Sequence, residues 1–79
     1  MDKELLVKTV KGHGEVPTIS EVDLSGNNYQ GADLSGGSFI KVDFSHSDLS
    51  KACLKECNFV DCNFSGAKLD NANFRVFSF

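Results

Sequence analysis

A five-residue spacing of bulky apolar residues constrains this chain more than any other feature of its sequence. From residue 19 to residue 79, every fifth position holds a large aliphatic or aromatic side chain. These positions are Ile19, Leu24, Tyr29, Leu34, Phe39, Phe44, Leu49, Leu54, Phe59, Phe64, Leu69, Phe74 and Phe79. A helix repeats about every 3.6 residues and a strand every second residue, so neither keeps one face at this spacing. The chain must therefore turn once in every five residues.

Each five-residue unit combines an apolar pair with a polar turn. The position two before the bulky residue is small in most units, as at Ala32 before Leu34, so both side chains can point inward from a short extended segment. Glycine often follows the bulky residue by two positions, as at Gly26 and Gly66, where a positive φ costs least. Asp or Asn directly before the bulky residue can bond the nearby backbone. The pattern predicts an apolar interior and a polar exterior.

These units resemble those of pentapeptide-repeat proteins over residues 17–79. The sequences Ala32-Asp33-Leu34-Ser35-Gly36, Val22-Asp23-Leu24-Ser25-Gly26 and Cys62-Asn63-Phe64-Ser65-Gly66 are similar to the A(D/N)LxG-type unit of that family. The resemblance implies an all-β fold, a right-handed quadrilateral β-helix with four units in each coil and parallel pairing between coils. This solenoid would have about three coils, and residues twenty apart would lie one above another.

The twenty-residue register predicts a core. The small inner column Ala32, Ala52 and Ala72 is uniform, as volume matching between stacked coils requires. The predicted core residues are Leu24, Tyr29, Leu34, Phe39, Phe44, Leu49, Leu54, Phe59, Phe64, Leu69 and Phe74.

Residues 1–16 lie outside the β-helix predicted for residues 17–79. Leu5, Val7 and Thr9 occupy alternate positions, which indicates a strand-like segment in place of a helix. Because solenoids need terminal caps, we expect this segment to cover the first coil, with a flexible tail as the alternative.

The composition excludes several partners. The 8 Lys and Arg residues against 11 Asp and Glu residues give a net charge of -3, so the chain lacks the cationic surplus that binds nucleic acid or anionic lipid. Its N-terminal apolar run, Leu5 to Val7, is too short for a signal peptide or a membrane span. We therefore expect a cytoplasmic protein with reduced cysteines, no direct nucleic-acid partner and no membrane partner.

Metal binding is not expected from the cysteines and histidines. Cys57 and Cys62 should point into the core, whereas Cys53 should point outward and stay accessible. These thiols and the imidazoles of His13 and His46 therefore do not converge on one ion. We expect no metal and no cofactor.

Catalysis is not expected either. Asp43, Ser45 and His46 should face outward on one side, but a convex rod offers no pocket for a catalytic triad. We interpret Asp43 and Ser45 as turn residues and His46 as a replacement for a turn glycine. Gly12-His13-Gly14 lacks the lysine and the following helix of a phosphate loop.

One side of the predicted rod is a candidate partner face. Ile40 and Val60 should point outward there, beside the charges of Lys41 and Asp61. The sequence thus favours a non-catalytic protein–protein interaction module whose partner it does not identify. The family resemblance implies an alternative, because some pentapeptide-repeat proteins mimic duplex DNA, bind type II topoisomerases such as gyrase and protect them from quinolones.

The C-terminal coil is a candidate contact between two copies. Phe77 replaces the usual small residue beside Phe79, and no polar cap follows these residues in the sequence. Phe74, Phe77 and Phe79 would leave apolar rims exposed, which natural solenoids avoid. We therefore expect a homodimer through this end.

Overall fold

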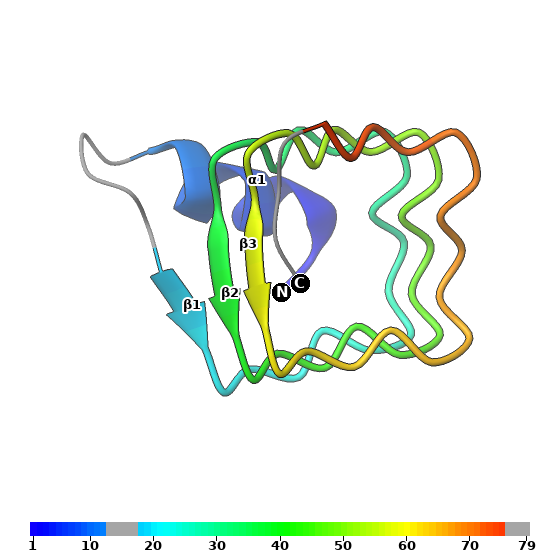
Figure 1. Cartoon of the computed structure of the whole chain (residues 1–79), viewed down its shortest axis with the longest axis horizontal. Coiled ribbons are helices and arrows are strands. Elements are labelled where there is room, and N and C mark those ends of the chain that lie inside the picture. Colours follow the sequence, from blue (N-terminus) through cyan, green and yellow to red (C-terminus); the bar gives the residue numbers. More distant parts are fainter. Residues whose placement is uncertain (13–17, 76–79) are drawn as a thin grey trace.

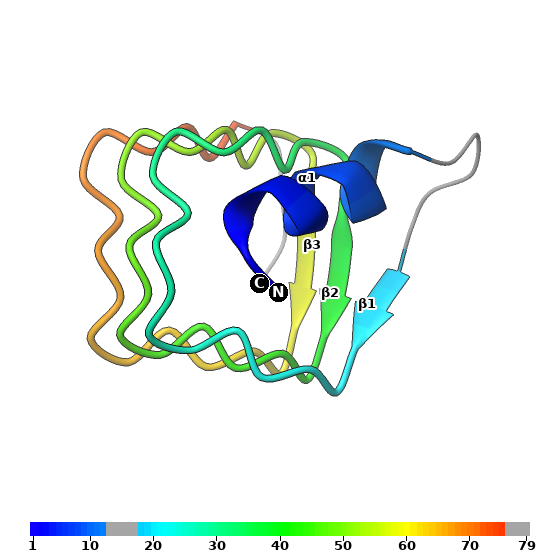
Figure 2. The same ribbon diagram turned by 180° about the vertical axis from the view of Figure 1, so that it is seen from behind.

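The computed structural model describes residues 1–12 and 18–75. This part of the chain forms one helix, α1 (Lys3–Lys11), and three short strands, β1 (Thr18–Ser20), β2 (Ser38–Ile40) and β3 (Asn58–Val60). Successive passes of the chain lie side by side along their length (Figure 1), and α1 lies across one end of the stack (Figure 2). We name residues 18–37, 38–57 and 58–75 the first, second and third layers.

The strands form one parallel sheet in the order β1-β2-β3. Ile19 pairs with Phe39, and Phe39 pairs with Phe59, so the register is twenty residues. The same register continues outside the strands in isolated parallel bridges, such as that between Asp23 and Asp43. The predicted parallel pairing of residues twenty apart is confirmed.

A left-handed backbone conformation recurs at every fifth residue and turns the chain. Glycine occupies four of these corners, with φ between 67° at Gly26 and 79° at Gly36. His46 has a φ of 58°, so it does replace a turn glycine as predicted. The other two glycine corners are Gly31 and Gly66. The remaining corners carry side chains, and they are Glu21, Lys41, Lys51, Glu56, Asp61 and Asn71. This conformation costs residues with a Cβ atom roughly 1–2 kcal/mol, so other interactions must hold these corners in place.

Asp and Asn side chains provide one of those interactions. Oδ1 of Asp43 accepts a hydrogen bond from the Ser45 amide at 2.9 Å, and Oδ1 of Asp48 accepts one from the Ser50 amide at 3.0 Å. The same bond recurs at Asp23, Asn28, Asp33, Asn63 and Asn73. The predicted turn role of these residues is confirmed.

The inward side chains fill the interior from layer to layer. The buried bulky residues are Ile19, Leu24, Tyr29, Leu34, Phe39, Phe44, Leu49, Leu54 and Phe59. Phe64, Leu69 and Phe74 are half-buried and contact this core. Phe39 stacks on Phe59 and Phe44 stacks on Phe64, each with ring centroids 5.2 Å apart. Aromatic pairs of this kind add about 0.5–1.5 kcal/mol beyond the burial of their surface.

The expectation of a strand-like N-terminal segment is wrong, because residues 3–11 form α1. Leu6 and Val10 are four residues apart, so a helix places both on one face, and both are buried. The Asp2 side chain caps the helix by accepting a hydrogen bond from the Leu5 amide at 2.9 Å, and Gly12 ends it. These helical signals outweigh the weak alternation of apolar residues.

Polar contacts of Met1 and of Lys11 in α1 tie the N-terminal segment to the first layer. The hydroxyl of Tyr29 donates a hydrogen bond to the Met1 carbonyl at 2.6 Å. The Lys11 ammonium donates to the Ser35 carbonyl at 3.0 Å and lies 3.3 Å from Oδ1 of Asp33. The two buried side chains of α1 join the core between these contacts.

Replacing Phe59 by Ala should lower the free energy of unfolding by about 3–5 kcal/mol, because the change opens a cavity in the aromatic stack. Val60→Ala should be nearly neutral, because the Val60 side chain lies outside the core and is 39% exposed. Urea unfolding followed by circular dichroism measures both effects. Similar losses at the two positions would contradict the inward and outward assignment.

Candidate interaction face

The outward side chains of the sheet form one continuous surface. The last residues of β1, β2 and β3 point away from the core and pair in register. A charged corner residue follows each of them. We name this surface the strand face, and its residues are Ser20, Ile40, Val60, Glu21, Lys41 and Asp61.

Ile40 and Val60 form an apolar strip on the strand face. Val60 is exposed and Ile40 is half-buried. Both side chains are β-branched, so they have little rotational freedom to lose when a partner covers them. An apolar strip with a polar rim is a feature of interaction sites.

The charges beside this strip alternate in sign. Glu21, Lys41 and Asp61 are all exposed, and none of them takes part in an ion pair within the described residues. Their backbone is held by the sheet, since the Glu21 amide donates to the Ile40 carbonyl at 2.9 Å and the Lys41 amide to the Val60 carbonyl at 2.7 Å. The strand face therefore presents its charges from a fixed backbone.

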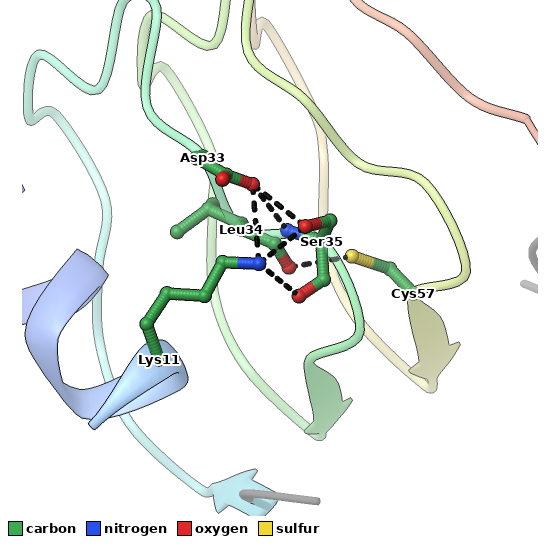
Figure 3. Close-up of polar contacts among 5 residues, drawn as sticks. All are labelled: Lys11, Asp33, Leu34, Ser35 and Cys57. Carbon is green, nitrogen blue, oxygen red and sulfur yellow. Dashed lines mark hydrogen bonds and ion pairs between the residues drawn. The ribbon is translucent and has the colours of Figure 1, made fainter. Parts of the chain in front are cut away.

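A second polar cluster joins α1 to the first layer (Figure 3). The Ser35 hydroxyl donates to Oδ1 of Asp33 at 2.7 Å, and Lys11 contacts both residues. The Ser35 hydroxyl, the Ser35 amide and the Lys11 ammonium together lower the pKa of the Asp33 carboxyl, although partial burial opposes them. The sequence did not predict this contact, because Lys11 was assigned to a strand-like segment. A lysine near the end of a helix that stops at Gly12 was the signal.

The three cysteines differ in their surroundings. Cys57 is buried and its thiol donates to the Leu34 carbonyl at 2.9 Å (Figure 3). Burial raises the pKa of Cys57 to about 11 and also raises the pKa of Cys62, which is half-buried and donates to the Phe39 carbonyl. Cys53 is half-buried. Within residues 1–12 and 18–75, no group of three metal-binding side chains gathers, and His13 lies outside these ranges.

Asp43, Ser45 and His46 do not form a catalytic arrangement. The Asp43 carboxylate bonds the Ser45 amide, which is the turn contact described above. The His46 imidazole lies instead against the next layer, where a Cβ atom on Gly66 would be 2.5 Å from Nδ1 of His46. The imidazole therefore fills the space that the absent side chain of Gly66 leaves.

The predicted contact between two copies is only partly described. Phe74 is half-buried, whereas Phe77 and Phe79 lie outside the described residues. The prediction that these residues form a dimer contact stays a prediction.

A family model described as pentapeptide repeats matches the chain in eight copies, over residues 19–55 and 57–76. The match covers well over half of the sequence. The chain belongs to the pentapeptide-repeat family. Pentapeptide repeats imply a β-helix and generally build structural or interaction modules. No curated protein matches the chain closely enough for comparison. In the described part of this repeat protein, no helix has the length and apolar character needed to cross a membrane.

Thiol labelling of the native protein should modify Cys53 faster than Cys57. The Cys57 thiol is buried and its pKa is about 11, so almost none of it is the reactive thiolate at neutral pH. Mass spectrometry of peptides after timed alkylation measures the rates. All three cysteines should react alike in denaturant, and equal rates in the native protein would contradict the assignment.

Asp33→Asn should make folding less sensitive to acid. The pKa of Asp33 is lowered from 3.8 in the folded chain, so its ionised form favours folding above that value. This contribution is lost as the pH falls through the lowered pKa. Asn keeps an oxygen for the Ser35 amide but does not ionise. The free energy of unfolding should therefore change less in the variant than in the wild type between about pH 5 and pH 2. Equal changes in denaturant titrations would contradict this.

Proposed function

We propose that this chain is a non-catalytic protein–protein interaction module that binds its partner through the strand face. The observation that carries the proposal is the apolar strip of exposed Val60 and half-buried Ile40 beside the charges of Glu21, Lys41 and Asp61, which form no ion pair within the described residues. Contact with a partner would remove the apolar strip from water. It would also give each of these three charges an ion-pair partner of opposite sign, which none of them has within the described residues.

The scaffold in this proposal is a right-handed quadrilateral β-helix of about three coils. Four sides per coil are supported by the four sets of partners at twenty-residue spacing. One set is the sheet, and the others contain the bridges Asp23–Asp43, Asn28–Asp48 and Asp33–Cys53. Such a scaffold favours binding because its backbone loses little conformational freedom when a partner docks.

Mimicry of DNA toward a type II topoisomerase such as gyrase is the alternative, and it has less support. A duplex as long as the 31 Å greatest extent of this chain carries about 18 phosphate charges. The chain has a net charge of only -3. Inhibition of gyrase supercoiling at concentrations where an unrelated acidic protein has no effect would favour this alternative.

Val60→Lys should abolish capture of the partner, because it places a charge in the apolar strip. Affinity capture from the native host, followed by quantitative mass spectrometry, should find at least one protein that the wild type retains and the variant loses. Because Val60 is outside the core, the variant should unfold at nearly the same denaturant concentration as the wild type.

Ser65→Lys is the matched control. Ser65 is exposed and occupies the same position in its five-residue unit as Val60, but on another side of the stack. This control should retain every protein that the wild type captures. The proposal fails if Val60→Lys captures the same proteins as the wild type, or if both lysine variants lose the same set.

A further inference from the structure

The charged corners of the strand face form an evenly spaced row of alternating sign. Glu21, Lys41 and Asp61 follow the ends of three strands that lie side by side and run in one direction (Figure 1). Their φ angles of 54°, 54° and 53° are nearly equal, so the three side chains leave equivalent corners in the same direction. We name these three residues the charge ladder. Because neighbouring strands lie about 4.8 Å apart, the ladder spans about 10 Å across the layers.

The charge ladder is available to a partner. All three side chains are exposed, and within residues 1–12 and 18–75 none of them forms an ion pair, not even with the opposite charge in the next layer. Ile40 and Val60 come directly before Lys41 and Asp61 in the chain, so the apolar strip runs along the ladder. A partner that covers the strip therefore also meets the charges.

An α-helix that lies along the stack matches the spacing of the ladder. Residues i, i+3 and i+7 of a helix share one stripe of its surface, and the second and third lie about 4.5 and 10.5 Å along the axis from the first. The second and third charges of the ladder lie about 4.8 and 9.6 Å from the first. A helix is also about 10 Å wide, so it can cover the apolar strip beside the ladder.

Extended segments and sheets match the ladder less well. Side chains on one face of a strand lie about 6.7 Å apart, so three of them in a strand that crosses the layers span about 13 Å. A strand laid parallel to β1, β2 and β3 would meet a single charge of the ladder. A second sheet packed on the strand face would cross it at about 30°, which moves the outer charges of that sheet away from the ladder.

We propose that the partner of the strand face docks through an amphipathic helix that lies along the stack and carries a basic, an acidic and a basic residue at positions i, i+3 and i+7. This inference rests on the proposed function, because it takes the strand face as the binding surface. The two basic residues pair with Glu21 and Asp61, and the acidic residue pairs with Lys41. Apolar residues beside this row of the helix cover Ile40 and Val60.

Two alanine-based helical peptides of about 20 residues test the charge pattern. The first peptide carries Lys, Glu and Lys at i, i+3 and i+7, with leucine at i+4 and i+8. The matched control has the same composition in the order Lys, Lys and Glu, so overall charge does not distinguish the two. Titration of the isotope-labelled protein, followed by NMR, measures both dissociation constants. The wild type should bind the first peptide at least about tenfold more tightly at low salt, and about 0.5 M NaCl should reduce this preference by screening.

The triple variant Glu21→Lys, Lys41→Glu and Asp61→Lys reverses every sign of the ladder. Lysine and glutamate both already occupy left-handed corners of this chain, so the variant should fold, which circular dichroism checks. The variant should bind the control peptide more tightly than the first peptide, which inverts the order of the wild type. The reason is that the control then meets two opposite charges, whereas the first peptide meets three like charges.

The inference is overturned if neither peptide shifts the strand-face resonances of the wild type at several millimolar, or if the wild type binds both peptides alike. It is also overturned if the folded triple variant keeps the order of the wild type. The capture experiment with Val60→Lys separates this failure from that of the proposed function. If Val60→Lys loses a captured protein while the peptides fail, the strand face binds a partner without such a helix. If Val60→Lys captures the same proteins as the wild type, the proposed function itself fails.

Discussion

The backbone hydrogen bonds between layers determine every other feature of this structure. The Phe44 amide donates to the Asn63 carbonyl at 2.8 Å, and the Asn63 amide donates to the Val42 carbonyl at 3.0 Å, so each layer both gives and receives bonds. This exchange works only if the chain returns to the same place after twenty residues. The turn after every fifth residue follows from that requirement, and Lys51 and Glu56 adopt left-handed corners although glycine would do so at lower cost.

The same requirement separates structural residues from residues that are available for binding. Positions two before a bulky residue, and the bulky residue itself, are committed to the interior. Most Asp and Asn side chains directly before the bulky residue are occupied with turn amides. The position after the bulky residue and the corner are the least constrained, and the strand face is built from these two. Side chains there can vary without changing the fold, so binding specificity can be encoded in them at little cost in stability.

Most of the repeat was readable from the sequence because each of its rules is local. A bulky residue every fifth position and glycine at Gly26, Gly36 and Gly66 are enough to infer the turns and the twenty-residue pairing. The N-terminal helix was not predicted because the spacing of its apolar residues fits both the period of a helix and the two-residue period of a strand. Leu6 and Val10 suit a helix, whereas Leu5 and Val7 suit a strand, and only contact with the first layer decides between them.

The candidate sites were less predictable because they depend on exposure, and exposure depends on which layers have neighbours. Phe44 and Phe64 have the same residue type and the same place in the repeat, yet Phe44 is buried and Phe64 is half-buried. The contact of Lys11 shows the same principle at the other end of the stack. In the second layer, the Lys55 carbonyl accepts a hydrogen bond from the Gly36 amide of the first layer. The equivalent carbonyl of the first layer, that of Ser35, accepts a hydrogen bond from the Lys11 ammonium instead. A side chain of α1 thus satisfies a group that an adjacent layer would otherwise bond. The two ends of the stack are therefore chemically different: α1 packs on the first layer, whereas in the third layer the Leu69 amide and the Ala67 carbonyl have no partner among the described residues.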